Sequence, residues 1–236
     1  MFVPLWDLNP LENVKFQWVT VGLILTNLLV FLLFQVGVLL PVSTEALVSF
    51  AVIPAELMGQ SQLGEAVKGA VAIPERATLL TYMFLHGNIL HLAGNMIFLW
   101  VFGDNVEDAM GHFRFLLFYL LCGVFAGFAH TFMRPDSDVP MIGASGAVAG
   151  VIAAYLMLHP NVRVWILALF RIPLRVSAGF ALAVWIALQI VSVMLDKGGG
   201  TAWWAHIGGL MAGAVLIVFM RKPGIPLFDR STGLTT

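Results

Sequence analysis

The stretch Met141-Ile142-Gly143-Ala144-Ser145-Gly146-Ala147-Val148-Ala149-Gly150 opens a long apolar run near the middle of the chain. It places the hydroxyl of Ser145 among small residues at the start of a hydrophobic segment. Burying a polar group in apolar surroundings costs free energy unless the group is paired, so such residues often have a function. The stretch therefore directs attention to the apolar runs around it and to a partner for the serine.

The composition indicates a membrane protein. Hydrophobic residues make up 60% of the chain and charged residues only 11%, whereas soluble domains carry about 25% charged residues. The charged residues leave six long charge-free runs: 16–44, 77–103, 115–133, 139–162, 176–195 and 198–220. Each run can supply the roughly 20 apolar residues of a transmembrane helix. A transmembrane barrel would instead need alternating segments of about ten residues, and none occur.

The expected fold class is therefore an all-α membrane protein, a bundle of six transmembrane helices in one domain. We expect residues 1–15 to form a short cytoplasmic N-terminal segment, 16–220 the helical domain and 221–236 a short cytoplasmic tail. The first loop, about 41–78, is long and apolar, and we expect it to lie partly in the outer interface, packed against the bundle. The fourth loop, 161–175, is expected at the cytoplasmic interface.

The distribution of positive charge predicts the orientation. Lysine and arginine are enriched in cytoplasmic loops. The terminal segments and the second and fourth loops contain eight of these residues: Lys15, Arg114, Arg163, Arg171, Arg175, Arg221, Lys222 and Arg230. The other three loops contain four: Lys68, Arg76, Arg134 and Lys197. Both termini are therefore expected to be cytoplasmic.

The compact six-span form without a removed signal peptide favours a prokaryotic inner membrane. The net charge of −1 and the lack of a basic tail give no indication of nucleic-acid binding. The sequence gives no indication of the oligomeric state. Cys122 is the only cysteine, which excludes an internal disulfide.

Polar residues in the second and sixth runs match the position of the serine. The second run, with a span expected at 79–103, contains His91 and Asn95 on one helix face, and His86 nearer the first loop. The sixth contains His206. Ser145, His206 and His91 each lie thirteen to fifteen residues before the residue that ends the span: Pro160, Arg221 and Asp104, respectively. At ~1.5 Å per residue they share one layer, about 20 Å from the cytoplasmic ends.

Small residues beside the serine and histidine predict that their helices approach closely. Gly146 follows Ser145, while Gly209 and Gly213 lie on the face of His206, and such stripes allow close helix packing. A histidine base can activate a serine hydroxyl. Because no acidic residue lies in the six runs, a complete Ser-His-Asp triad is not expected. Free backbone N–H groups at the start of the fourth helix and the Asn95 amide, helped by His91, could stabilise an oxyanion.

These segments resemble the rhomboid intramembrane serine proteases. Gly143-Ala144-Ser145-Gly146 is similar to their Gly-x-Ser-Gly motif, and 205–213 to their Ala-His-x-x-Gly-x-x-x-Gly motif; 86–95 matches their second-span His and Asn pattern. The resemblance implies that Ser145 is the nucleophile and His206 the general base. It further implies oxyanion support by Asn95 and His91, first-loop support by His86, and packing by the motif glycines Gly143, Gly146, Gly209 and Gly213. Transmembrane proteins would be the substrates, cleaved in a cavity open to the outer side.

Two departures from the family pattern concern positioning. The first loop lacks the Trp-Arg pair of many members, so its anchor is not evident. Ala149 stands where some members stack an aromatic ring on the histidine, so other groups must hold His206, with packing of the second span as one candidate.

Other functions remain as alternatives. A catalytically silent rhomboid-like protein would bind transmembrane clients without cutting them, although such proteins usually lose the serine or the histidine. A transporter would be expected to show repeated halves or broken helices. A metal site at His86, His91 and His206 is not favoured, because no carboxylate ligand is near, and no cofactor is expected.

Overall fold

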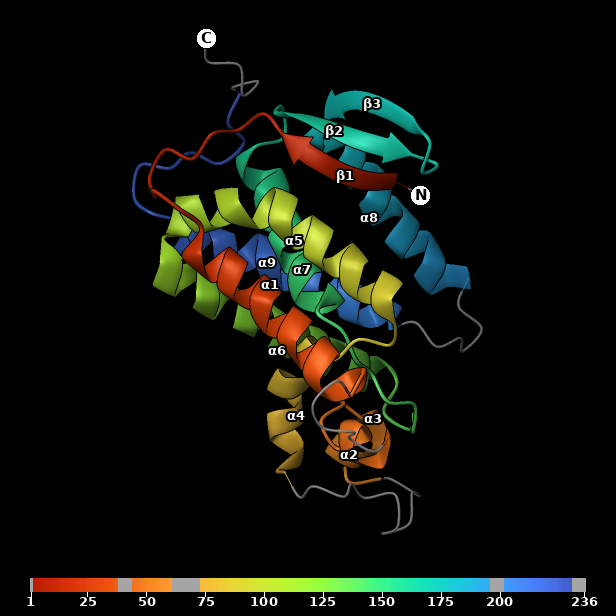
Figure 1. The fold of residues 1–236 in the computed structure, drawn as a ribbon. Coiled ribbons are helices and arrows are strands. Elements are labelled where there is room, and N and C mark those ends of the chain that lie inside the picture. Colours follow the sequence, from red (N-terminus) through yellow and green to blue (C-terminus); the bar gives the residue numbers. More distant parts are fainter. Residues whose placement is uncertain (1, 38–43, 61–72, 196–201, 231–236) are drawn as a thin grey trace.

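The computed structural model describes residues 2–37, 44–60, 73–195 and 202–230. A bundle of helices dominates them (Figure 1): α1 (Trp18–Val30, continued by the π-helical turn Phe31–Gln35), α5 (Ile89–Met110), α6 (His112–Met133), α7 (Ser145–Leu158), α8 (Ala178–Leu195) and α9 (Trp203–Met220). Within the described residues, five helices are long and apolar enough to cross a membrane, and α7 is a shorter apolar helix of 14 residues. The expected helical membrane fold is confirmed: the chain is a multi-pass integral membrane protein.

Helix α7 lies in the middle of the bundle, in contact with α5, α6 and α9 (Figure 1). Its residues from Gly146 to Tyr155 are all buried. Most of them are small, so neighbouring helices approach its backbone closely. A Cβ atom added at Gly209 would clash with the carbonyl oxygen of Gly146, and one added at Gly213 would clash with that of Gly150. The small residues thus bring α9 against α7.

The second span begins later than the sequence suggested. The chain forms α4 (Glu75–Thr81) and a 3₁₀ turn (Tyr82–Phe84), and α5 starts only at Ile89. Asn88 caps α5, because its side-chain oxygen accepts a hydrogen bond from the His91 N–H at 2.9 Å. At its other end α5 continues to Met110 through residues that we expected in a loop. His86 therefore lies outside the helix that contains His91 and Asn95.

The described part of the first loop packs against the bundle. It includes the short helices α2 (Thr44–Val48) and α3 (Pro54–Leu57), and residues 51–55 are buried. Val52 and Met141 exchange two backbone hydrogen bonds of 3.1 and 2.7 Å, and the Ala55 N–H donates to the Ser137 carbonyl. The loop is thus anchored on the segment that leads into Ser145. Residues 41–43 and 61–72 of this loop lie outside the described residues.

A small antiparallel sheet was not predicted from the sequence. It consists of β1 (Phe2–Asp7), β2 (Arg163–Ala168) and β3 (Ile172–Ser177), in the order β1-β2-β3. It joins the N-terminal segment to the fourth loop, and β1 also contacts α5. In Figure 1 the sheet lies at the opposite end of the bundle from α2, α3 and α4. The N-terminal segment and the fourth loop were expected to be separate pieces, because neither has a local pattern that indicates its distant partner.

Two buried carboxylates tie the N-terminal region to the end of α5. Glu107 accepts hydrogen bonds from the backbone N–H groups of Val19 and Thr20 at 3.0 and 2.8 Å, which satisfies free donors at the start of α1. Asp108 accepts from the N–H groups of Asn13 and Val14 at 2.7 and 2.6 Å. The position of α1 is thus fixed against α5.

Candidate active site

Ser145 is the first residue of α7, and a constrained turn places it there. Gly143 has φ +125°, a conformation that residues with a Cβ rarely adopt. A Cβ at this position would also lie 2.7 Å from Cε1 of His91. The Gly143 N–H donates to the Tyr82 carbonyl at 2.9 Å, which holds the turn against the 3₁₀ segment. Glycine at 143 is therefore required by both backbone conformation and space.

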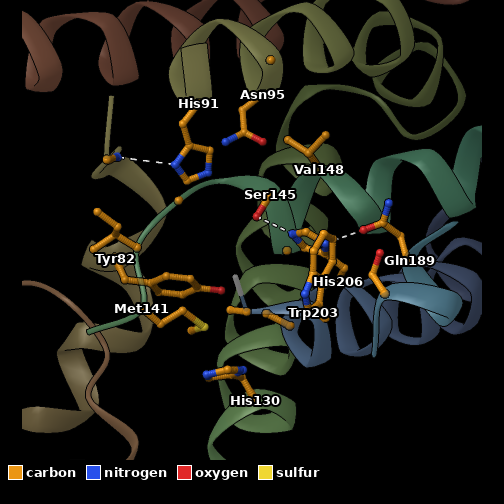
Figure 2. A pocket seen from close by; sticks show the side chains of 18 of the residues that line it. Tyr82, His91, Asn95, His130, Met141, Ser145, Val148, Gln189, Trp203 and His206 are labelled. Atoms are coloured by element: carbon orange, nitrogen blue, oxygen red, sulfur yellow. Dashed lines mark hydrogen bonds between the residues drawn. The ribbon is translucent and has the colours of Figure 1, made fainter. Parts of the chain in front are cut away.

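The structure brings Ser145 and His206 together. The serine Oγ lies 2.8 Å from Nε2 of His206, which is within hydrogen-bond distance (Figure 2). His206 lies on α9, is only 9% exposed and reaches the serine because α7 and α9 pack at their glycines. The two residues predicted from depth and spacing thus form one pair.

Gln189 on α8 is a site residue that the sequence analysis did not identify. Its Oε1 lies 2.7 Å from Nδ1 of His206 (Figure 2). Its Nε2 donates to the carbonyl oxygen of Trp185 at 3.3 Å, which orients the amide so that Oε1 faces the histidine. A carbonyl oxygen can only accept, so the Nδ1 of His206 carries the hydrogen and Nε2 is left as an acceptor for the serine hydroxyl.

Two indole rings complete the surroundings of His206. The ring of Trp203 meets that of His206 edge-on at a centroid distance of 5.7 Å, and Trp185 lies at 6.1 Å. Groups on α8 and α9 therefore hold the histidine, rather than packing of the second span. The signal was present in the sequence, because Gln189 is the only amide in the run 176–195.

Asn95 and His91 lie on the other side of Ser145 (Figure 2). The Asn95 side chain is 7% exposed, and its Nδ2 has no hydrogen-bond partner among the described residues. Nδ1 of His91 accepts a long hydrogen bond from the Gly87 N–H at 3.4 Å. A buried amide donor without a partner is costly, so Asn95 is available to bind a group that enters the site.

His86 is buried beside His91. Its backbone N–H donates to Oε1 of Gln35 at 2.9 Å, and Nε2 of Gln35 donates back to its carbonyl at 2.6 Å. Its ring meets that of His91 edge-on at 5.1 Å. Burial, and secondarily the neighbouring His91, lowers the pKa of His86 to about 3, so its ring is neutral at physiological pH. These bonds tie His86 to the end of the first span.

Apart from His86 and Gln35, all these groups line one cavity of about 940 Å³. The cavity extends from the loops at 87–88 and 139–143 to the side chains of Phe98 on α5 and Trp185 on α8. Within the described ranges, no group of three or more His, Cys, Asp or Glu side chains is placed to hold a metal ion. The site is thus a hydroxyl–imidazole–amide chain in a largely apolar cavity of a membrane protein.

Fold and site define a helical membrane protein with a serine–histidine pair, and sequence comparison identifies its family. Residues 74–223 match the family model described as the Rhomboid domain, which is more than half of the chain. The chain belongs to the rhomboid family.

Curated relatives share about a third of the aligned residues. Rhomboid-like protein 11, chloroplastic, of Arabidopsis thaliana is 31% identical over 61% of this chain and 52% of its own length. RHOMBOID-like protein 6, mitochondrial, of the same plant is 32% identical over 63% of this chain and 45% of its own length. The human presenilin-associated rhomboid-like protein, mitochondrial, is 30% identical over 60% and 37%.

The chain thus spans about a third to a half of the length of these relatives. Their names place them in chloroplasts and mitochondria, which does not support the prokaryotic inner membrane expected from the sequence.

Proposed function

We propose that this protein is an intramembrane serine endopeptidase that hydrolyses peptide bonds in or near the transmembrane segments of membrane proteins. The observation that supports the proposal most directly is the 2.8 Å separation between Ser145 Oγ and His206 Nε2, inside a cavity within the helical bundle. Membership of the rhomboid family supports the same reaction.

In the proposed mechanism His206 is the general base. Its Nε2 removes the hydroxyl proton as Ser145 Oγ attacks the carbonyl carbon of the scissile peptide bond. The resulting imidazolium then donates that proton to the leaving amine, and the peptide C–N bond breaks to leave an acyl-enzyme. A water molecule, deprotonated by His206, hydrolyses the ester and restores the serine.

Gln189 is the proposed positioning residue for His206. Its carbonyl oxygen holds the Nδ1–H tautomer, which is the form that can accept a proton at Nε2. Because the Gln189 amide is neutral, it orients the ring without supplying the charge that an aspartate would contribute in a Ser-His-Asp triad.

The oxyanion of the tetrahedral intermediate would be stabilised from two sides. Asn95 offers an Nδ2 donor with no partner among the described residues, next to His91. The first N–H groups of α7, beginning at Ser145, lack carbonyl partners within the helix and point toward its N-terminus. Such preorganised donors give large rate contributions in acyl transfer.

The proposed substrate is a transmembrane helix that unfolds locally. A helix in the bilayer satisfies its own backbone hydrogen bonds, so a peptide bond reaches Ser145 only after that segment unwinds. The cavity reaches between α5 and α8, at Phe98 and Trp185, and we place lateral entry there. We propose that the termini face the cytoplasmic side, or its equivalent, and that the cavity opens on the opposite side.

The test is cleavage of a single-span reporter by purified protein in detergent, without added cofactor. We expect cleavage by the wild type, none by Ser145→Ala, and fluorophosphonate labelling that requires Ser145 and falls strongly in His206→Ala. Cleavage retained by Ser145→Ala would overturn the proposal. A folded wild type that binds the reporter but neither cleaves it nor reacts with fluorophosphonate would instead indicate the silent, client-binding alternative.

A further inference from the structure

The small sheet has one face on the bundle and one face away from it. Successive residues of a strand point to opposite sides. In β2, Val164 and Ile166 are buried against the bundle, while Trp165 between them belongs to the outer face. Trp165 pairs in register with Trp6 of β1 and with Arg175 of β3. The two indole rings are 5.7 Å apart, and Trp6 is 51% exposed.

This outer face is positively charged. Arg163 and Arg175 alternate with Val164 and Val176 along their strands and share the side of Trp165. Both are exposed, and among the described residues neither has an acidic partner within ion-pair distance. An arginine fork matches the geometry of a phosphate group, and tryptophan favours the boundary between lipid chains and headgroups.

An apolar groove lies along β1, the strand that carries Trp6. It has a volume of about 380 Å³ and lies between β1, α1 and α5. Its lining residues are all apolar: Val3, Pro4, Leu5, Ile24, Ala93, Met96, Ile97, Trp100 and Val101. Leu5 precedes Trp6, so the groove adjoins the tryptophan pair. A surface of arginine and tryptophan side chains next to an apolar groove matches the anionic headgroup and the acyl chain of a phospholipid.

We propose that the outer face of the sheet binds an anionic phospholipid, with its phosphate on Arg163 and Arg175 beside the tryptophan pair and an acyl chain in the groove. The groove favours a lipid over an acidic protein segment, which would need polar partners for its backbone. The site lies in a multi-pass membrane protein, where lipid is always present. Because β3 ends at Ser177 and α8 begins at Ala178, bound lipid stabilises the end of the helix that carries Gln189.

The test measures dioleoylphosphatidylglycerol binding to the purified full chain in detergent by native mass spectrometry, with dioleoylphosphatidylcholine and inorganic phosphate as separate arms. The double variant Arg163→Gln/Arg175→Gln should bind the anionic lipid about 25-fold more weakly, from about fivefold for each arginine. The matched control Arg114→Gln/Arg230→Gln removes two exposed arginines elsewhere and should bind within about twofold of the wild type.

A second variant tests the groove. Ala93→Leu fills part of it and should weaken dioleoylphosphatidylglycerol binding, while leaving binding of the short-chain dihexanoyl lipid unchanged. Equal binding of the anionic and the zwitterionic lipid, or an unchanged affinity in the double arginine variant, would overturn the proposal. So would an equal loss in the two double variants, since net charge alone would then explain the binding. Binding of inorganic phosphate as tightly as the lipid would show a phosphate site only.

Discussion

Replacing Gln189 tests how the histidine is held. Gln189→Leu removes the acceptor for the Nδ1–H of His206 while keeping a side chain of similar size. Gln189 and His206 are only 6% and 9% exposed, so the orphaned N–H gains little from water. A buried donor without a partner costs about 1–3 kcal/mol. The histidine avoids that cost by rotating or by taking the other tautomer, and either change removes the base from Ser145.

The free-energy cost of the unpaired Nδ1–H predicts how much the reaction of Ser145 slows. Since about 1.4 kcal/mol corresponds to a factor of ten, Gln189→Leu should react about 5-fold to about 150-fold more slowly than the wild type. Two assays measure this: the second-order rate constant for fluorophosphonate labelling of Ser145, and kcat/KM for a single-span reporter. Gln189→Glu keeps an acceptor at the same place and should stay within about tenfold of the wild type.

Matched controls separate positioning from folding. Gln60→Leu makes the same exchange at an exposed position after α3 and should leave both rates unchanged. Thermal unfolding in detergent should show that Gln189→Leu remains folded at the assay temperature. If Gln189→Leu reacts within twofold of the wild type while Ser145→Ala is inactive, the reasoning about Gln189 is refuted and the proposed nucleophile still stands.

Three further perturbations follow from the structure. Asn95→Ala should lower kcat about 100-fold with little change in KM, as expected for an oxyanion donor; an unchanged kcat would exclude that role. Gly209→Ala should lower the free energy of unfolding by about 1–3 kcal/mol, measured by thermal unfolding, because its Cβ would clash with the Gly146 carbonyl; Gly22→Ala, where nothing lies within 4 Å, is the control. Burial raises the pKa of Asp7 to about 6 despite its hydrogen bond from Tyr155. The folded state therefore favours the protonated form, and its stabilisation is complete below pH ~4 and lost as the pH rises through 6. The hydrogen-exchange protection factors of residues 2–7, which correct for the intrinsic rise of amide exchange with pH, should fall over that window in the wild type but not in Asp7→Asn.

The first-loop anchor and the sheet show why parts of the fold escaped prediction. The pairing of Val52 with Met141 joins segments about ninety residues apart, and β1 pairs with a strand more than 150 residues away. None of these segments has a local sequence pattern that indicates its partner. The fourth loop, 161–175, is too short to cross the bilayer. Within it the buried side chains of Val164 and Ile166 alternate with Trp165, and this pattern indicates a strand only when β1 and β3 are known to lie beside it.

Part of the candidate site could likewise be predicted from the sequence, and part could not. Ser145 and His206 could be paired from sequence because helix rise converts residue count into depth, and because glycine stripes indicate which helices approach. Gln189 could not be assigned to His206, because one amide in an apolar run does not reveal the direction in which its helix turns it. That depends on how α8 packs beside α9.

By itself the sequence determined the class of the protein and the layer of its polar groups. Too few charges to cover a water-facing surface, and a bilayer that requires backbone hydrogen bonds within each span, leave few folds for such a chain. Only the tertiary structure decided which groups meet: Gln189 with His206, Val52 with Met141, and β1 with β2. Those contacts join residues far apart in the chain, and their energies depend on distances of a few ångströms that local patterns do not encode.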